Sequence, residues 1–158
     1  MHEVILVGVD GSVGGYAAVA EAAEVAKRFG AKLIALSVEE GLPRAPVTKG
    51  EVDDWKEERD RYFEEVRRAA ARIAGEHGWS LRHDVRIGGA ADQIIHFAQE
   101  VKADLIVLGY KGHSRIAEAV IGTTAQKVNA HSKASVLIVK PTTPSEAIWA
   151  RIVSAEDR

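Results

Sequence analysis

The stretch that decides the fold runs from Asp104 to Lys140 and reads DLIVLGYKGHSRIAEAVIGTTAQKVNAHSKASVLIVK. An apolar run ends in Gly109, a loop carries Gly112, and Gly122 with two threonines opens a helical pattern. A second apolar run closes the stretch, so the order predicts a strand, a loop, a helix and another strand. Because glycines leave the main chain uncovered, we expect the loop to hold a ligand against bare backbone.

The rest of the chain repeats this alternation. Five segments are predicted to be strands: Val4–Val9, Lys32–Val38, Ser80–Ile87, Leu105–Leu108 and Val136–Val139. Helical patterns lie between them, at Tyr16–Phe29, Glu51–His77, Ala91–Val101 and after Gly122. This alternation predicts a single-domain α/β fold, an open twisted five-stranded parallel sheet with helices on both faces. The expected strand order, 3-2-1-4-5, follows from the fold class, and the charges of the third strand favour an edge position.

Two segments differ from this regular pattern. The helical pattern 51–77 carries one apolar stripe, since its apolar residues recur at spacings of three, four or seven: Val52, Trp55, Tyr62, Val66, Ala69 and Ile73. We interpret it as a solvated amphipathic helix lying on the sheet, in preference to a helix that binds a partner or a membrane. We expect one domain over residues 1–141 and a C-terminal tail over 142–158, in which 147–153 favours a short helix.

Composition limits the classes of function. The chain has 158 residues, 46% of them hydrophobic, with a formal net charge of −2 and no cysteine. The charge shows no basic surplus of the kind typical of nucleic-acid-binding modules. The longest apolar runs are too short to span a bilayer. The N-terminus enters a strand pattern with acidic Glu3, unlike a signal peptide, so we expect a cytoplasmic protein with no nucleic-acid or membrane partner.

The glycines of the opening stretch follow the spacing Gly109-x2-Gly112-x9-Gly122-Thr123. Gly109 would let a bulky group approach the strand end, and Gly112 would allow positive φ, so that successive N–H groups point into one concavity. Gly122 and Thr123 stand at the start of a helix, where free N–H groups and the helix dipole favour an anion, and Thr124 adds a second hydroxyl. These features suit a phosphate chain. The alternative is that the glycines only shape turns and a helix cap.

Asp10 lies at the end of the first strand, beside the proposed loop if the strand order is right. It could bind ribose hydroxyls or hold a metal near phosphates, or it could close a turn before Ser12, which is a predicted helix N-cap. No GxxxxGK[ST] motif and no GxGxxG after the first strand are present, which argues against a P-loop or a dinucleotide site. The six histidines show no metal-ligand spacing, and those outside the loop are predicted to lie at the surface.

These residues resemble the universal stress protein family, from about Glu3 to Lys140. The opening VILVGVDGS looks like the family's first strand and aspartate, and DLIVLGYKGHSRIAEAVIGTTAQKV looks like the signature of its ATP-binding branch. The nine-residue gap between Gly112 and Gly122 matches that branch in register. The family commonly has serine where Thr123 stands and often valine where Thr124 stands, and threonine keeps the hydroxyl at the first of these positions.

The resemblance implies ATP as ligand, with Mg²⁺ or Mn²⁺, and a homodimer that pairs through the fifth strand. It places one group of residues around the adenosine, namely Val9, Asp10, Val38, Leu108 and Gly109. It places another group at the phosphates, namely Gly112, Gly122, Thr123 and Thr124. His113, Arg115 and Lys111 could contact or neutralise the phosphates, or could be solvated loop residues. The resemblance also implies a signalling or stress-resistance role that depends on nucleotide occupancy.

Catalysis has less support in the sequence. A hydrolase needs a group that positions water and stabilises developing charge, and no carboxylate or glutamine falls inside the loop, with Glu118 the nearest. The favoured hypothesis is therefore an ATP-binding regulatory dimer with little or no hydrolysis. One alternative is a weak ATPase or an enzyme that phosphorylates itself on Ser114, Thr123 or Thr124. Another is a dimerisation module that binds no nucleotide.

Overall fold

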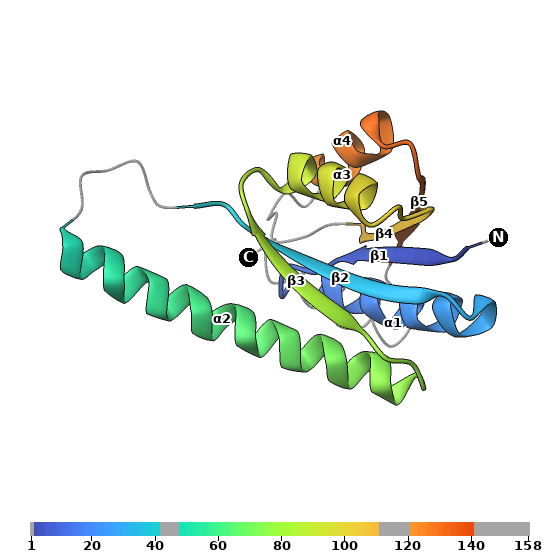
Figure 1. Cartoon of the computed structure of the whole chain (residues 1–158), viewed down its shortest axis with the longest axis horizontal. Coiled ribbons are helices and arrows are strands. Elements are labelled where there is room, and N and C mark those ends of the chain that lie inside the picture. Colours follow the sequence, from blue (N-terminus) through green and yellow to red (C-terminus); the bar gives the residue numbers. More distant parts are fainter. Residues whose placement is uncertain (1, 42–47, 111–120, 141–158) are drawn as a thin grey trace, which may run out of the picture.

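The computed structural model describes residues 2–41, 48–110 and 121–140. Its strands and helices alternate along the chain, as Figure 1 shows. Several residues that the sequence assigns to the phosphate loop, Gly112, His113 and Arg115 with Lys111, lie outside the described residues, and so does the tail 142–158. Structural statements below therefore concern the described residues.

The sheet has five parallel strands in the order β3-β2-β1-β4-β5, which confirms the predicted fold class. The strands are β1 (Val4–Gly8), β2 (Lys32–Glu39), β3 (Arg82–Ile87), β4 (Leu105–Gly109) and β5 (Ser135–Val139). β1 lies at the centre, where Ile5, Leu6 and Val7 are completely buried. An apolar run buried on both faces is what a central parallel strand requires. The charged β3 is at one edge, as its composition predicts.

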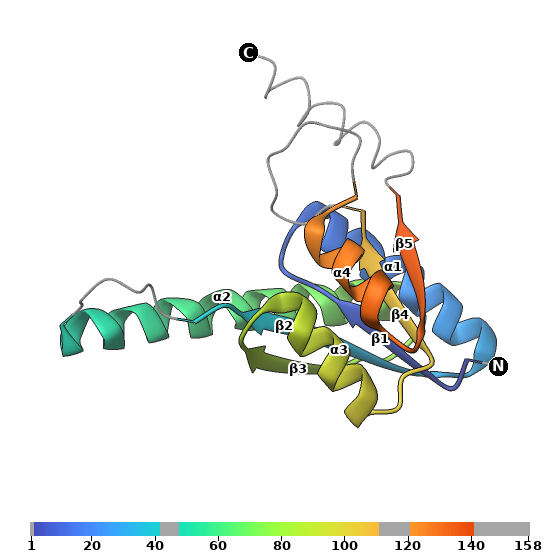
Figure 2. The same cartoon turned by 90° about the horizontal axis from the view of Figure 1, so that it is seen from above.

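Helices cover both faces of the sheet (Figures 1 and 2). They are α1 (Val13–Phe29), α2 (Lys49–Glu76), α3 (Ala90–Glu100) and α4 (Thr123–His131). One core forms where α1 and α2 meet the face that carries Ile5 and Val7. The other core forms where α3 and α4 meet the face that carries Leu6 and Ile106. Alternate residues of the same strands thus supply both cores.

Helix α1 begins earlier than the sequence predicts. Ser12 is its N-cap, since its hydroxyl oxygen accepts a hydrogen bond from the N–H of Gly15 at 3.1 Å. This bond satisfies one of the free donors of the first turn and brings Gly14 and Gly15 into the helix despite their poor helix propensity. The predicted cap residue is confirmed, and the predicted start at Tyr16 is three residues late.

Helix α2 is 28 residues long, and its two halves differ in what they contact. The buried positions lie in its second half: Phe63, Val66, Ala70 and Ala74. The first half extends beyond the carboxyl ends of the strands (Figures 1 and 2). The predicted stripe is thus close to the buried face, but Ala70 replaces the half-buried Ala69 as its core position.

Among the described residues, no helix is long and apolar enough to cross a bilayer.

The end of β4 packs closely on the start of α1. A Cβ atom on Gly109 would lie 2.6 Å from the carbonyl oxygen of Gly14 and 2.7 Å from its carbonyl carbon. We expected Gly109 to make room for a ligand, but the space that its missing side chain leaves is filled by α1. Glycine is needed here because backbone atoms cannot give way as a flexible side chain can.

We predict that Gly109→Ala destabilises the protein by about 1–3 kcal/mol, since the added methyl group overlaps the backbone of α1. Urea denaturation measures the change. Gly75→Ala is the matched control, because a Cβ at this helical position meets nothing within 4 Å. It should stabilise the protein by about 0.5–1 kcal/mol. Equal effects of the two substitutions would contradict the packing argument.

Candidate nucleotide-binding site

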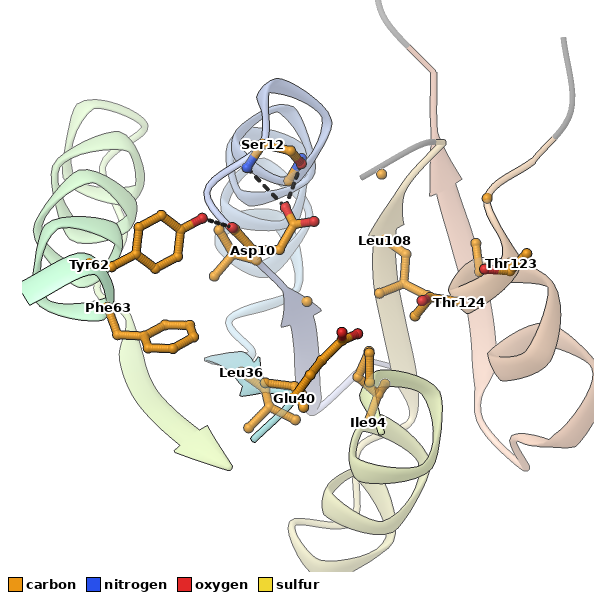
Figure 3. Close-up of a pocket in the computed structure, with 18 of the residues that line it drawn as sticks. Asp10, Ser12, Leu36, Glu40, Tyr62, Phe63, Ile94, Leu108, Thr123 and Thr124 are labelled. Atoms are coloured by element: carbon orange, nitrogen blue, oxygen red, sulfur yellow. Dashed lines mark hydrogen bonds between the residues drawn. The ribbon is translucent and has the colours of Figure 1, made fainter. Parts of the chain in front are cut away.

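A pocket of about 680 Å³ opens at the carboxyl ends of β1 and β4 (Figure 3). Between these two strands the chain changes direction across the sheet, since β2 lies on one side of β1 and β4 on the other. Ligands of open parallel sheets bind at such a point, because the loops on either side part there. The walls come from the ends of β1, β2 and β4 and from the helices α1, α2, α3 and α4.

All eight of the described residues that the sequence assigns to the site line this pocket. They are Val9, Asp10, Val38, Leu108, Gly109, Gly122, Thr123 and Thr124. They come from positions up to 115 residues apart, Val9 and Thr124, and meet because parallel strands end at the same edge. The predicted contacts of Gly112, His113 and Arg115 fall outside the described residues.

Helix α4 presents its N-terminus to the pocket. Gly122 is the N-cap and makes no side-chain cap bond, and the first bond of the helix runs from the N–H of Gln126 to the Gly122 carbonyl at 3.0 Å. Within the described chain, the N–H groups of Thr123, Thr124 and Ala125 therefore have no acceptor. All three residues line the pocket. Free donors at the positive end of a helix dipole favour an anion.

Asp10 stands across the pocket from α4 (Figure 3). Its Oδ1 accepts hydrogen bonds from the N–H of Ser12 at 2.9 Å and from the Ser12 hydroxyl. Its backbone carbonyl accepts a hydrogen bond from the hydroxyl of Tyr62. Burial, and then the charge of Asp10, raise the pKa of Tyr62, so the tyrosine stays a neutral donor. The turn-closing role of Asp10 is thus present in the structure, and the turn holds its carboxylate at the wall of the pocket.

Helix α2 forms a further wall, from its extended half and the start of its buried half, which sequence reasoning missed. It brings Trp55, Arg59, Tyr62 and Phe63 to the pocket. The guanidinium carbon of Arg59 lies 5.1 Å from the centre of the Tyr62 ring and 4.9 Å from that of Phe63. A signal was available in the pattern, because Arg59 is a charged residue at a position of the apolar stripe, four residues after Trp55. Glu40, just beyond β2, also lines the pocket and was missed.

No group of three or more histidine, cysteine, aspartate or glutamate side chains is placed to hold a metal ion, among residues 2–41, 48–110 and 121–140. The described residues thus supply single oxygen ligands at the pocket, such as Asp10, Glu40 and the threonine hydroxyls, and no ready-made cage.

Comparison with known proteins decides the family. The model of the universal stress protein family matches residues 1–140. The chain belongs to the universal stress protein family.

Relatives agree with this assignment along most of their length. Universal stress protein Rv1636 of Mycobacterium tuberculosis is 32% identical over 147 residues, which cover 89% of this chain and 98% of the relative. The solved structure of universal stress protein UspA from Lactobacillus plantarum is 27% identical, with a TM-score of 0.76 over 87% of this chain and 97% of that one. A crystal structure of a universal stress protein in complex with cAMP is 29% identical, with a TM-score of 0.67 over 87% and 96%.

In this universal stress protein a buried relay steadies the end of β1. The hydroxyl of Ser37, which is completely buried, donates to the carbonyl of Val9 at 2.6 Å. Since that hydroxyl has only one proton, the Nε2 of His83, 2.8 Å from the same oxygen, must donate to it. The relay joins β3, β2 and the residue before Asp10. His83, which the sequence predicts to lie at the surface, is half-buried, because its ring turns inward to Ser37.

The relay depends on a neutral His83. Burial, and then the positive charge of Arg67, lower the pKa of His83 to about 4. Its Nδ1 is buried with no hydrogen-bond partner among the described residues, so a proton there would find no acceptor. The unfolded chain would bind that proton with the ordinary pKa of about 6.5. Stability from His83 is therefore complete above pH 6.5 and is lost as the pH falls towards 4.

We predict that His83→Gln weakens this pH dependence. The glutamine amide can still donate to Ser37, but it does not titrate. Between pH 7 and pH 4.5, the unfolding free energy of the native protein should fall by about 1–2 kcal/mol more than that of the variant. This figure is reduced from the full value of the pKa shift because His83 is partly exposed. Urea denaturation at each pH measures the difference, and parallel curves for the two proteins would contradict the assignment.

Proposed function

We propose that the protein binds ATP in this pocket, with the adenosine towards the ends of β1 and β2 and the phosphates at the N-terminus of α4. The observation that carries the proposal is that one pocket combines a surface of hydrogen-bond donors with an apolar surface. The uncapped first turn of α4 offers N–H groups and the hydroxyls of Thr123 and Thr124. The floor beside it is apolar, with Leu36, Val38, Ile94 and Leu108.

The two surfaces match the two halves of a nucleotide. An apolar floor with few polar groups suits a flat base, which must leave water to bind. A helix N-terminus with hydroxyl donors suits phosphate oxygens. Asp10, between them, is placed to accept hydrogen bonds from ribose hydroxyls. The related structure in complex with cAMP, at 29% identity, supports an adenine nucleotide as the ligand class. The Gly109-x2-Gly112-x9-Gly122-Thr123 spacing favours ATP within that class.

Mg²⁺ or Mn²⁺ would accompany the phosphates. When bound, the ion supplies charge neutralisation between phosphate oxygens. The residues present fit such a role only in part, since Asp10 Oδ1 already accepts two hydrogen bonds from Ser12. We therefore propose that this chain holds the nucleotide chiefly through its backbone donors and its hydroxyl groups, and that the ion is held mainly by ATP itself.

We propose a regulatory role in stress resistance, with little or no hydrolysis. The carboxylates that line the described pocket are Asp10 and Glu40. Asp10 is held in its turn by Ser12, and the side-chain amide of Gln126 donates to the carbonyl of Ile121 at 2.5 Å. Asp10 and Gln126 are thus engaged by the chain itself and are not set to orient a water molecule for attack on a phosphate, which leaves Glu40 as the other carboxylate of the described pocket. Phosphate release under multiple turnover, lost in the Thr123→Val variant, would overturn this part of the proposal.

We predict that ATP with Mg²⁺ binds the native protein in calorimetry, and that Thr123→Val and Thr124→Val each weaken binding by about 5- to 30-fold. Each substitution removes a hydroxyl donor and keeps the side-chain shape, and a hydrogen bond to a charged group contributes about 1.5–3 kcal/mol, of which solvent at the open pocket replaces a part.

Ser132→Ala is the control, because Ser132 lies at the other end of the same helix and does not line the pocket. This variant should bind ATP as the native protein does. If the native protein shows no heat of binding and no thermal stabilisation at millimolar ATP, the proposed function is contradicted.

We also propose a homodimer that pairs through β5. This strand is an edge of the described sheet, with β4 on its inner side. An unpaired strand edge is a template for pairing with a second chain. We predict that sedimentation equilibrium gives twice the chain mass of 17.1 kDa. Ser135→Ala, at an exposed position of the same strand, should leave that dimer intact. Ile138→Pro should shift it to monomer, because the N–H of Tyr110 bonds to the carbonyl of Val139 and the N–H of residue 138 therefore faces the open edge. A native protein that sediments as a monomer would rule the dimer out.

A further inference from the structure

Arg59 is the cation that the described part of the pocket contains, and it lies on α2, not on the strand ends that carry the predicted site. It occupies the apolar stripe of α2, where the half-buried Trp55 precedes it and Phe63 follows. A charged residue at such a position loses hydration on the inner side of its helix. Its placement needs either an ion partner or a ligand.

The described residues supply no such partner. Arg59 makes neither an ion pair nor a hydrogen bond with any of them, while Arg67, Arg68 and Arg72 of the same helix pair with glutamates. Its Nε is covered by protein and has no acceptor. Its contacts are instead with the faces of Tyr62 and Phe63, at 5.1 and 4.9 Å. The guanidinium thus lies against two aromatic rings, and its terminal nitrogens are the donors left for the pocket.

The position of Arg59 separates it from the phosphate end. Figure 3 shows Tyr62 and Phe63 of α2 on one side of the pocket and Thr123 and Thr124 of α4 on the other. Asp10 stands between the two sides. Because the guanidinium lies against the rings of the α2 side, it belongs to the half of the pocket that lies away from Thr123 and Thr124.

We propose that Arg59 is a base-recognition residue: its terminal N–H groups donate to a ring nitrogen of the bound purine, and its plane covers the base. The proposal rests on the proposed function, since it names the contact that the nucleotide makes on its base side. A planar cation with several donors suits a purine edge, whose ring nitrogens are acceptors, and guanidinium planes stack on bases. α2 would thus act as a side wall that selects the base, while α4 binds the phosphates.

The test compares Arg59→Met with Arg61→Met. Methionine keeps an unbranched apolar side chain in the stripe and removes the donors. Arg61 is the matched control, because it is exposed on the same helix, carries the same charge and does not line the pocket. Affinities for ATP, adenosine and inorganic tripolyphosphate are measured by calorimetry, with urea denaturation as a check of folding. If Arg59→Met does not fold, Arg59→Gln, which stays polar, carries the same expectation.

Arg59→Met should weaken the binding of ATP and of adenosine by about the same factor, roughly 10-fold or more. It should leave the affinity for tripolyphosphate unchanged. Arg61→Met should leave all three affinities unchanged. Loss of tripolyphosphate affinity with adenosine unaffected would make Arg59 a phosphate contact and overturn the proposal. Unchanged ATP affinity in Arg59→Met, or an equal loss in Arg61→Met, would overturn it too while the proposed function stands. A native protein that binds no ATP would instead overturn the proposed function, and this inference with it.

Discussion

The turn that ends β1 is the constraint on which the rest of the site depends. Ser12 caps α1, and Asp10 holds Ser12, so the strand and the helix meet at a fixed angle. Tyr62 of α2 then holds the carbonyl of Asp10, and a Cβ on Gly11 would collide with its hydroxyl, at a position where φ is +85°. On the other side, Ser37 holds the carbonyl of Val9. Since His83 of β3 also contacts the Ser37 hydroxyl, three strands and two helices meet at this one short segment, and the pocket opens beside it.

The pocket takes its chemical division from the two faces of the sheet. α1 and α2 pack on one face, α3 and α4 on the other, and the carboxyl edge lies between them. The N-terminus of α4 brings backbone donors to one side of the pocket. The overhang of α2 brings aromatic rings and Arg59 to the other side. A nucleotide with a flat base at one end and charge at the other would satisfy both sides.

The fold was predictable because its signals are local or general. Strands that alternate with helices favour a parallel sheet, and the handedness of crossovers restricts the strand order. The pocket residues of β1 and β4 were predictable for the same reason, since strand ends of one sheet share an edge. The sequence does not show that Gly109 makes room for Gly14, because that contact joins two elements about 95 residues apart.

The missed residues are also contacts between distant elements. Arg59 and Tyr62 reach the site only because α2 is longer than the sheet beneath it, a property of assembly and not of the local pattern. His83 looked like a surface residue among charges, yet Leu81, His83 and Val85 alternate with a period of two and share an inner face. The two hydrogen bonds that hold the carbonyls of Val9 and Asp10, just beyond β1, likewise come from side chains of distant elements, β2 and α2.

Amide chemical shifts during an ATP titration test the central claim most directly, because each backbone N–H reports its own surroundings. The claim is that one ligand joins the ends of β1 and β2 to the first turn of α4. It predicts that Thr123, Thr124 and Ala125 shift together with Asp10 and Val38 along a single binding curve. The amides of β3 between Arg82 and Val85 should stay unchanged. Shifts confined to another surface, or separate curves for α4 and for the strand ends, would contradict it.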